Sequence, residues 1–524
     1  FLSGYGINNN LAVKIYKEYG DHLYTIIQEN PYKMTDDIAG VGFKIADEIA
    51  KKVGIGSRSD YRIISGIFYT LMRALNEGHV FLPKRILCRN AAHILGVTPE
   101  DIEEHLLEMM IDRKIVIEED EETRVYAAPQ YHMEVNTARM LLDLNIHYDV
   151  SISEVETMIA MIEETEQITF AEKQKEAIHA VAQDSIVVLT GGPGTGKTTT
   201  INGMIQYFEH EGLDIRLAAP TGRAAKRMTE STGREAKTIH RLLEMGYATD
   251  SEELQFMKNE EDPITADVII IDEVSMVDVL LMYSLLRAIK PGTRLILVGD
   301  SDQLPSVGAG NVLKDMIDSN VINVVRLNEI FRQARESMIV VNAHKINKGE
   351  PFFFLRKGTN EEVIEEIVGL VSERLPKFYK LDKLKDIQIL SSMRKGDLGV
   401  INLNNELQKY LNPPHKFKVE ESFQKRIFRV GDKVMQIKNN YTKKWENEDK
   451  SESGEGIYNG DIGYIYHIDK ENKKIYVLFD QVKIVSYGYD ELDELDHSFC
   501  TTIHKSQGSE FPVVVIPITW APPM

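Results

Sequence analysis

A glycine-rich segment between an apolar run and a helical pattern has the residue types and spacing of a phosphate-binding loop. It fits the pattern G-x-x-x-x-G-K-[ST] from Gly191 to Thr198. Glycines in such a loop let backbone N–H groups face nucleotide phosphates, Lys197 can reach the β and γ phosphates, and the Thr198 hydroxyl can ligate Mg²⁺. A glycine-rich turn that binds nothing is disfavoured by the complete pattern in this setting. The expected nucleotide-binding residues are Gly192, Pro193, Gly194, Thr195, Gly196, Lys197, Thr198 and Thr199.

Two adjacent carboxylates follow an apolar strand about seventy residues later. The run Val268–Ile271 ends in Asp272 and Glu273. At a strand end Asp272 would hold Mg²⁺, usually through water, and Glu273 would orient or deprotonate the attacking water. An isolated Asp-Glu pair is most often a solvated turn, but its spacing from the phosphate loop favours the catalytic interpretation. The pair therefore predicts nucleotide hydrolysis as well as binding.

Four further segments lie in a fixed order around these two motifs. They are Phe170–Gln174, Gly299–Gly310, Leu327–Gln333 and Thr501–Phe511. Taken singly, Gln174, Arg332 and His504 would be interpreted as surface or structural residues. Their order reverses that interpretation, because together the segments resemble the motifs of superfamily 1 DNA helicases. The RecD/TraA group is the best match, and within it the stand-alone RecD-like helicases with an N-terminal extension.

The resemblance implies ATP and Mg²⁺ as ligands and gives individual residues roles at the nucleotide. Gln174 matches the glutamine that contacts adenine, Gln303 would sense the γ-phosphate, and Arg332 would stabilise transition-state charge. The late motif would connect nucleotide to DNA through Gln507, Gly508 and Glu510. The expected catalytic residues are Lys197, Asp272, Glu273, Gln303 and Arg332, and the expected metal ligands are Thr198 and Asp272.

The resemblance also implies contacts with single-stranded DNA. Threonine and backbone N–H contacts to phosphates suit a translocating motor, because they are sequence-blind and can be remade at each step. The segment Glu244–Pro263 occupies the place of a small strand-separating pin, and an ordinary exposed loop is the alternative. The expected DNA-binding residues are Pro220, Thr221, Gly222, Arg223, Thr238, His240, Asn459, Thr502 and His504.

The activity implied by the resemblance is ATP-driven unwinding of duplex DNA with 5′-to-3′ movement on single strands, in repair or recombination. Single-stranded DNA and junctions of single- and double-stranded DNA are the expected partners of a monomer without membrane contacts. A protein partner, for example a single-stranded DNA-binding protein, could dock on the N-terminal region. A nucleotide-controlled DNA-binding switch or loader without directional movement is the main alternative, and an RNA helicase is a third interpretation.

The sequence departs from the family in two places. The last family motif normally continues into a helix with another ATP-facing arginine, and this sequence ends first, which truncation or a missing segment explains. The stretch Asn347–Phe352 is also short beside relatives. We find no nuclease-like carboxylate cluster, so unwinding without cutting is expected.

Composition sets limits on the class of protein. The 524 residues predict three to four domains, and 43% hydrophobic with 27% charged residues is an ordinary globular composition. A net charge of −20 argues against a binder whose whole surface attracts polyanions, but a motor can confine positive potential to one channel. Cys88 and Cys500 lack metal-site spacing and are expected to be small buried residues. No secretory or membrane-spanning run is evident, so a cytoplasmic location is expected.

The motifs require parallel strands that end at one edge of a sheet. Short β-rich runs separated by helical segments predict such a sheet, flanked by helices: Ser185–Thr190, Asp214–Ala219, Val268–Ile271 and Arg294–Val298. A second α/β unit begins near residue 360, with Ile387–Leu390 and Val513–Ile516 as buried strands. Residues of about 425–490 suggest short antiparallel strands. The expected fold is α/β, with two RecA-like P-loop motor domains (156–355 and 356–524) and a small SH3-like β-barrel inserted in the second.

The N-terminal region predicts helices. Glycine-containing turns at Ser3–Ile7 and Ile38–Ala46 resemble helix-hairpin-helix motifs over residues 1–60, and their glycines would let backbone N–H groups approach a DNA phosphate. A tight helix–helix turn without a ligand is the alternative. Residues 61–155 form a mainly helical domain, with a strand pair at Lys114–Ile117 and Val125–Ala127, to which we assign no chemistry.

Overall fold

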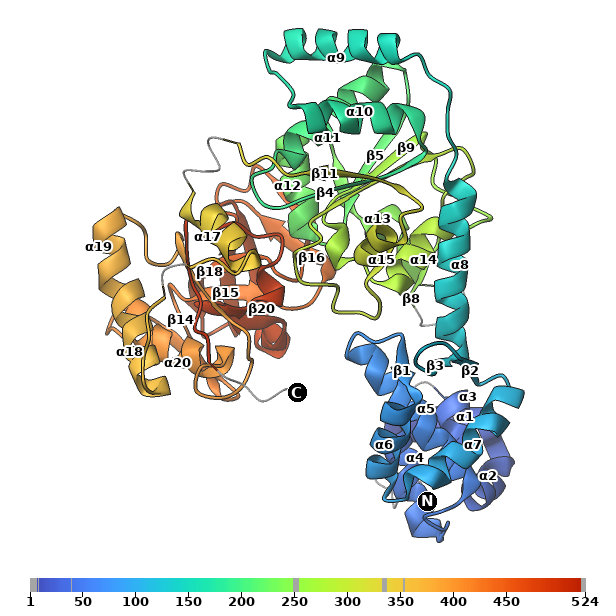
Figure 1. The fold of residues 1–524 in the computed structure, drawn as a ribbon. Coiled ribbons are helices and arrows are strands. Elements are labelled where there is room, and N and C mark those ends of the chain that lie inside the picture. The colour runs from blue at the N-terminus through green and yellow to red at the C-terminus, as the bar shows by residue number, and fades with distance from the viewer. Residues whose placement is uncertain are drawn as a thin grey trace.

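The computed structural model describes residues 7, 9–38, 40–247, 254–331, 337–351 and 354–519. Figure 1 shows an N-terminal helical part, a first α/β part and a second α/β part that includes an antiparallel sheet. This confirms the predicted α/β fold class. No helix within the described ranges is long and apolar enough to cross a membrane. Several predicted features lie outside the described residues, namely Ser3–Gly6 of the first hairpin, Ala39, Arg332, Gln333 and Phe352.

The N-terminal part has two apolar cores. Ile15, Ile27, Met34 and Ile49 lie in the first, and its helices are α1 (Asn9–Tyr19), η2 (Gly20–His22), α2 (Leu23–Glu29), α3 (Lys33–Asp37) and α4 (Phe43–Val53). The second core includes the buried thiol Cys88. It lies among α5 (Asp60–Asn76), α6 (Lys84–Leu95), α7 (Pro99–Ile111) and the antiparallel strands β1 (Phe81–Pro83), β2 (Ile115–Glu118) and β3 (Arg124–Ala127). The predicted strand pair is thereby confirmed.

A buried ion pair joins α4 to α5. Arg62 Nε donates to Asp47 Oδ1 at 2.7 Å, and the Tyr32 hydroxyl donates to the same oxygen at 2.8 Å. Burial by itself would raise the pKa of Asp47, but hydrogen bonds from Arg62, Lys51 and Tyr32 outweigh it and lower the pKa. Arg62 also donates to the Leu95 carbonyl at 2.8 Å, so one side chain connects α4, α5 and the end of α6.

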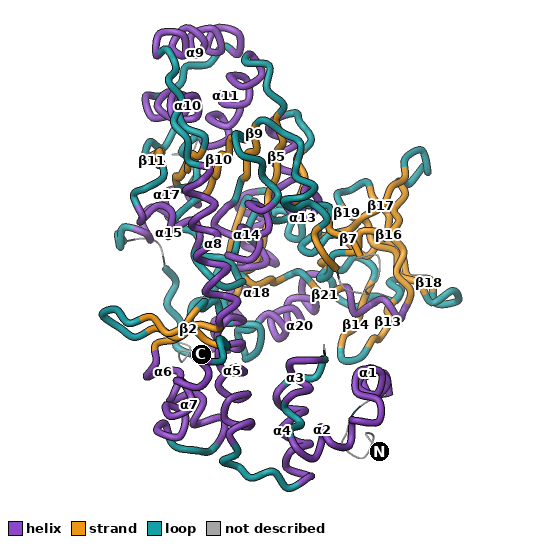
Figure 2. The backbone as a smooth tube through the Cα atoms, turned by 90° about the vertical axis from the view of Figure 1, so that its right-hand side faces the viewer, coloured by secondary structure: helices purple, strands orange, loops and turns teal. Residues whose placement is uncertain are grey.

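Helix α8 (Ala128–Leu144) joins the N-terminal part to the first α/β part, as Figure 1 and Figure 2 show. The two α/β parts correspond to the two expected motor domains and are called the first and second motor parts below. The last turn of α8 buries Leu141 and Leu144 in the same core as Met282 and Leu285 of α14 (Val279–Arg287). The helix is therefore part of the motor core at one end and of the N-terminal region at the other.

The first motor sheet has six parallel strands in the order β11-β4-β10-β9-β5-β6. The four predicted strands are confirmed as β4 (Ile186–Gly191), β5 (Ile215–Ala219), β9 (Val268–Ile271) and β10 (Arg294–Gly299); the edge strands β6 (Ala236–Thr238) and β11 (Asn323–Leu327) were not predicted. Alternate residues of β4 face opposite cores: Val187 and Leu189 lie in one, Ile186 and Val188 in the other. The flanking helices are α9 (Ile152–Glu166), α10 (Glu172–Gln183), α11 (Lys197–His210), α12 (Gly222–Thr232), α13 (Ile239–Leu242), η3 (Val274–Met276) and α15 (Val312–Ser319).

The second α/β part contains a small parallel sheet in the order β22-β12-β23, so both predicted strands are present. The strand at Ile387–Ser391 is buried as predicted, but the prediction of burial is wrong for the second strand: as an edge strand, Val513–Val515 is only half-buried, and Ile516 is 48% exposed. The strands of this sheet are β12 (Ile387–Ser391), β22 (Cys500–Thr502) and β23 (Val513–Val515), and the thiol of Cys500 is buried. The helices are α17 (Met338–Asn347), α18 (Asn360–Gly369), η4 (Leu370–Arg374), α19 (Leu375–Tyr379), α20 (Val400–Leu411), η5 (Tyr489–Glu494) and η6 (His504–Ser506).

Antiparallel strands form the insertion in the second α/β part. A seven-stranded sheet runs in the order β17-β16-β20-β19-β18-β15-β21, beside the hairpin of β13 (Glu420–Phe423) and β14 (Arg426–Arg429). The strands are β15 (Lys433–Gln436), β16 (Asn440–Glu446), β17 (Ser453–Ile457), β18 (Ile462–Asp469), β19 (Lys474–Phe479), β20 (Lys483–Gly488) and β21 (Leu495–His497). The predicted antiparallel character of this region is confirmed.

Candidate functional site: the phosphate loop and the interface between the motor parts

The phosphate loop connects β4 to α11 in a conformation that depends on glycine. Gly194 and Gly196 have φ of +75° and +82°, which is left-handed backbone. A Cβ on Gly191 would lie 2.6 Å from Thr195 Oγ1 and 2.8 Å from the Leu327 carbonyl oxygen. Thr195 and the end of β11 at Leu327 therefore pack closely against the first glycine of the loop. The loop backbone can form the N–H cradle expected for phosphates.

Lys197 is the cation at the centre of the site. Its Nζ donates to the carbonyls of Gly191 at 2.6 Å and Gly192 at 3.1 Å. Three carboxyl groups face Lys197, namely those of Asp272, Glu273 and Asp300. Burial raises the pKa of each, and the positive charge of Lys197 opposes this rise.

The residues present fit a magnesium ion bound together with a nucleotide. The Asp272 carboxylate and the Thr198 hydroxyl are the hard oxygen donors that Mg²⁺ prefers. The described residues contain no group of three or more His, Cys, Asp or Glu that could hold a metal. Mg²⁺ is commonly held by one or two protein oxygens plus substrate phosphates, which is the number of donors that Asp272 and Thr198 offer.

Glu273 is a buried carboxylate on strained backbone. Its side chain is 9% exposed, and its φ of +55° is uncommon for a residue other than glycine. The backbone N–H of Glu273 donates to Asp272 Oδ1 at 2.8 Å, which fixes the two carboxylates relative to each other. Strain of this kind concentrates at functional sites, where the surrounding structure holds it in place.

Arg227 joins this carboxylate to the second motor part. A role for this residue was not predicted from the sequence. Its Nη2 lies 3.6 Å from Glu273 Oε1, and its Nη1 lies 3.2 Å from Glu510 Oε1. Arg227 belongs to α12, the helix that begins after Thr221. The signal that could have found it is its spacing of four residues from Arg223, which places both cations on one face of a helix.

Gln174 supports the phosphate loop from α10. Its side chain is buried, accepts from the Ala171 N–H at 2.9 Å and donates from Nε2 to the Gly196 carbonyl at 3.2 Å. The structure therefore places this residue against the loop, and contact with adenine stays a prediction.

Gln303 and Gln507 lie in two segments that contact each other at the boundary between the motor parts. Gln303 is exposed and accepts from the Ser275 hydroxyl at 3.5 Å. Gln507 Nε2 donates to the Leu304 carbonyl at 3.2 Å, so the late motif contacts the loop that contains Gln303. Gly508 follows with φ +71° and approaches Thr221.

Helix α17 lies over the phosphate loop, a second feature that was not predicted. His344 Nε2 lies 3.2 Å from the Pro193 carbonyl oxygen, and Asn347 donates to Asp302 Oδ2 at 3.2 Å. A Cβ on Gly192 would lie 2.8 Å from His344 Cε1. Before this helix, the backbone N–H of Phe331 donates to the Gly194 carbonyl at 3.2 Å.

The expected DNA-binding threonines of the first motor sheet cap helices. Thr221 Oγ1 accepts from the Ala224 N–H, and Thr238 Oγ1 accepts from the Arg241 N–H, each at 3.2 Å. Pro220 follows the end of β5 directly. The pKa of His240 is lowered by burial, which favours its neutral form. These residues lie at the carboxyl ends of the neighbouring strands β5 and β6.

The structure brings the start of α12 together with residues far away in sequence. Arg223 donates to the Ser509 hydroxyl, and burial lowers the pKa of its guanidinium. A Cβ on Gly222 would lie 3.1 Å from the Tyr458 ring, and next to that ring the Asn459 N–H donates to Asn439 Oδ1 at 2.9 Å. Of the other expected DNA contacts, Thr502 ends β22, where its hydroxyl accepts from the Lys505 N–H at 3.2 Å, and His504 begins η6.

Family models match most of these parts. An ATP-dependent RecD2 DNA helicase HHH domain matches residues 1–81, an AAA domain 174–309, an ATP-dependent RecD-like DNA helicase SH3 domain 403–479 and a UvrD-like helicase C-terminal domain 497–524. An ATP-dependent RecD2 DNA helicase from Deinococcus radiodurans is 31% identical over 529 residues, covering 98% of this chain and 69% of that protein. The chain belongs to the RecD2 family of DNA helicases.

RecD2 membership confirms the resemblance seen in the sequence, including the helix-hairpin-helix and SH3-like parts, and makes the chain an ATP-dependent DNA helicase. A RecBCD enzyme subunit RecD from Mycolicibacterium smegmatis is 28% identical over 386 residues, covering 66% of this chain and 65% of that subunit. A crystal structure of Pif1 helicase from Candida albicans is 18% identical; the match covers 67% of this chain and 89% of that chain, with a TM-score of 0.38. The matched SH3 region begins at residue 403, earlier than the predicted 425.

Proposed function

We propose that this RecD2-family chain moves 5′-to-3′ on single-stranded DNA and unwinds duplex DNA during repair or recombination. The observation that supports a motor is that α12 lies both at the expected DNA contacts and at the expected hydrolytic carboxylate. Its first residues include the expected DNA contacts Thr221 to Arg223, and Arg227 one turn later pairs with Glu273. A change in DNA contact at the start of the helix can therefore reach the hydrolytic carboxylate along one rigid element.

The residues around the phosphate loop divide the chemistry of hydrolysis between them. Lys197 binds the β and γ phosphates, and Glu273 orients the attacking water and accepts its proton. Asp272 and Thr198 would hold Mg²⁺, which supplies neutralising charge for the phosphates. Gln174 contacts adenine, and Gln303 and Arg332 respond to the γ-phosphate.

Movement requires that the contacts between the motor parts change during the ATP cycle. Arg223 with Ser509, Arg227 with Glu510 and Gln507 with Leu304 all join the first motor part to the late motif. Closure around ATP and reopening after hydrolysis would remake these contacts, and an alternating grip on the strand would advance the enzyme.

The partners follow from the same proposal. Single-stranded DNA and junctions of single- and double-stranded DNA are the substrates of a monomer, and the N-terminal helices offer a surface for a protein such as a single-stranded DNA-binding protein. A cytoplasmic location is part of the proposal.

Strand displacement tests the proposal against a switch or loader. We expect the wild-type chain to displace a labelled strand from a duplex with a 5′ tail in ATP and Mg²⁺, and the Lys197→Ala variant to displace none. DNA-stimulated hydrolysis without displacement or translocation would favour the switch instead. Equal stimulation by a matched RNA strand would favour an RNA helicase.

A further inference from the structure

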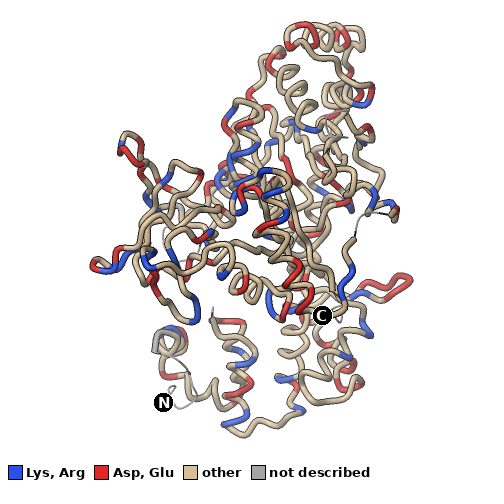
Figure 3. Tube along the Cα trace, turned by 90° about the vertical axis from the view of Figure 1, so that its left-hand side faces the viewer, with Lys and Arg blue, Asp and Glu red and all other residues tan. Residues whose placement is uncertain are grey.

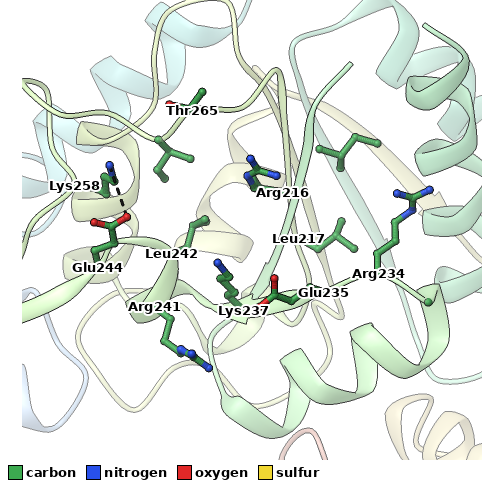
Figure 4. A pocket seen from close by; sticks show the side chains of 13 residues that line it. Arg216, Leu217, Arg234, Glu235, Lys237, Arg241, Leu242, Glu244, Lys258 and Thr265 are labelled. Carbon is green, nitrogen blue, oxygen red and sulfur yellow. Dashed lines mark ion pairs between the residues drawn. The ribbon is translucent and has the colours of Figure 1, made fainter. Parts of the chain in front are cut away.

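A polar pocket of about 730 Å³ opens at the edge of the first motor sheet, away from the phosphate loop. Figure 4 shows it between the strand residues Arg216 and Leu217, the edge residue Lys237 and the segment that contains Lys258. Its basic lining residues are Arg216, Arg234, Lys237, Arg241 and Lys258.

The charged residues that line the pocket are mostly basic, whereas those of the whole chain are mostly acidic. Five basic and two acidic residues, Glu235 and Glu244, line the pocket, whereas the whole chain has 61 basic and 81 acidic residues. Acidic residues are spread over all parts of the chain (Figure 3). A local excess of positive charge on an acidic protein indicates a binding site for an anion.

Not all of this positive charge is neutralised by the protein. Arg216 pairs with Asp214 at 2.9 Å, Lys258 pairs with Asp262 at 2.9 Å, and Arg234 pairs with Glu209. Within the described part of the chain, no carboxylate lies within 4.0 Å of the charged nitrogens of Lys237 or Arg241.

Lys237 and Arg241 therefore supply the charge that an anion would meet. Lys237 is half-buried, so it has lost part of its hydration without gaining an acidic partner. Among the described residues, the Arg241 side chain donates to the neutral Tyr458 hydroxyl, at 3.3 Å, and to no carboxylate, which leaves its charge uncompensated there.

The position of the pocket narrows the identity of the anion. Lys237 and Arg241 flank the expected DNA contacts Thr238 and His240 along the chain. The opposite wall is the base of a hairpin formed by β7 (Met245–Tyr247) and β8 (Leu254–Phe256), where the Lys258 N–H donates to the Leu243 carbonyl at 3.1 Å. This hairpin lies within the segment predicted to be the strand-separating pin.

We propose that the pocket binds the phosphodiester backbone of the strand that the hairpin separates from the translocating strand. The inference rests on the proposed unwinding function, since it requires a second strand at the hairpin. Lysine and arginine contacts to phosphates are sequence-blind and can slide along a backbone. An acidic peptide would satisfy the same charges, but the hairpin wall and the neighbouring DNA contacts favour DNA.

Two DNA substrates test the assignment. Both have the same duplex and 5′ tail, and one also has a single-stranded 3′ tail on the strand to be displaced. We expect the wild-type chain to bind the forked DNA more tightly than the DNA with the 5′ tail alone. In the Lys237→Gln and Lys237→Glu variants this preference should disappear, and the salt dependence of fork binding should fall by about one unit of log–log slope. Lys290→Gln, at an exposed lysine of the same motor part, is the matched control and should keep the preference.

The controls separate this inference from the proposed function. ATP hydrolysis stimulated by a single strand, and unwinding from the 5′ tail, should persist in the Lys237 variants, and melting temperatures should match the wild type. Equal binding of both substrates by the wild type would overturn the assignment, as would a Lys237→Gln variant with unchanged fork preference. Equal loss of fork and single-strand binding would place Lys237 on the tracking path and also overturn it. A fluorescent acidic peptide that binds in a Lys237-dependent manner, without effect of the 3′ tail, would assign the pocket to a protein partner.

Discussion

The Nη2 atom of Arg227 lies 3.6 Å from Oε1 of Glu273, so a helix with expected DNA contacts at its start also contacts the carboxylate expected to activate water. The same guanidinium contacts Glu510 of the late motif. Helix α12 thus carries the expected DNA contacts at its start and, through Arg227, contacts both the carboxylate expected to activate water and the late motif. Coupling between DNA binding and hydrolysis would require such an arrangement.

Replacement of Arg227 by glutamine should weaken this coupling. We expect the DNA-free kcat for ATP to rise because Glu273 is no longer restrained, and the ratio of DNA-stimulated to DNA-free kcat to fall by about fivefold or more. The KM for ATP should change little, and Arg227→Lys should retain most of the ratio. Steady-state ATP hydrolysis with and without oligothymidine measures this ratio of kcat values. Arg287→Gln, at another arginine of the same motor part, is the control. Equal loss of both rates, or no change in either, would contradict the coupling role.

Replacement of Lys197 by alanine should abolish hydrolysis without unfolding the chain. The side chain bonds only to loop carbonyls at 2.6 and 3.1 Å among the described contacts, so its removal leaves the apolar core intact. We expect kcat to fall by roughly 10²–10³-fold, the usual effect of losing one electrostatic contact to the reacting group. Lys173→Ala, at an exposed lysine, is the control; a Lys197 variant with near wild-type hydrolysis would remove the phosphate loop from the mechanism.

Introduction of a Cβ at Gly192 should disturb nucleotide binding through helix α17. The added atom would lie 2.8 Å from His344 Cε1, so the ring or the loop has to move. We expect Gly192→Ala to weaken ATP binding several-fold and the double variant Gly192→Ala/His344→Ala to recover part of the loss. A fluorescent ATP analogue measures both affinities. If the two variants bound equally weakly, the obstruction would not come from His344.

Loss of the Asp47 carboxylate should destabilise the N-terminal part. Asp47→Asn leaves the buried Arg62 without its counter-charge, which typically costs about 3–5 kcal/mol. Because the folded pKa of Asp47 is lowered, its contribution is complete above the unfolded pKa near 3.8 and is lost as the pH falls through the folded value. Urea unfolding at several pH values should show this acid loss in the wild type and less of it in the variant. Lys51→Ala removes only an exposed partner and should cost under about 1 kcal/mol; a similar cost for both variants would argue against the buried pair.

Local patterns in the sequence were sufficient for the strands and motifs that depend on neighbouring residues. The phosphate loop needs left-handed backbone at Gly194 and Gly196, and the buried strand before Asp272 has an uninterrupted apolar run. Such features are encoded within about ten residues, so spacing alone located them. The edge strands β6 and β11 were missed because β6 has three residues and β11 alternates buried with exposed positions.

Contacts between distant segments could not be predicted in the same way. Arg227 meets Glu510 across 283 positions of the chain, and His344 reaches Pro193 across 151. Neither residue belongs to a motif whose spacing indicates a partner. Gln174 was found by its motif, but its packing against Gly196 depends on how α10 lies beside the loop. Roles that need bound ATP or DNA therefore stay predictions for these residues.

Strand displacement from two partial duplexes, one with a 5′ tail and one with a 3′ tail, tests the central claim most directly. With ATP and Mg²⁺, a RecD2-type motor that moves 5′-to-3′ should displace the labelled strand only from the substrate with the 5′ tail. Displacement only from the 3′-tailed substrate would contradict the proposed direction, and no displacement from either, despite DNA-stimulated hydrolysis, would contradict the proposed unwinding.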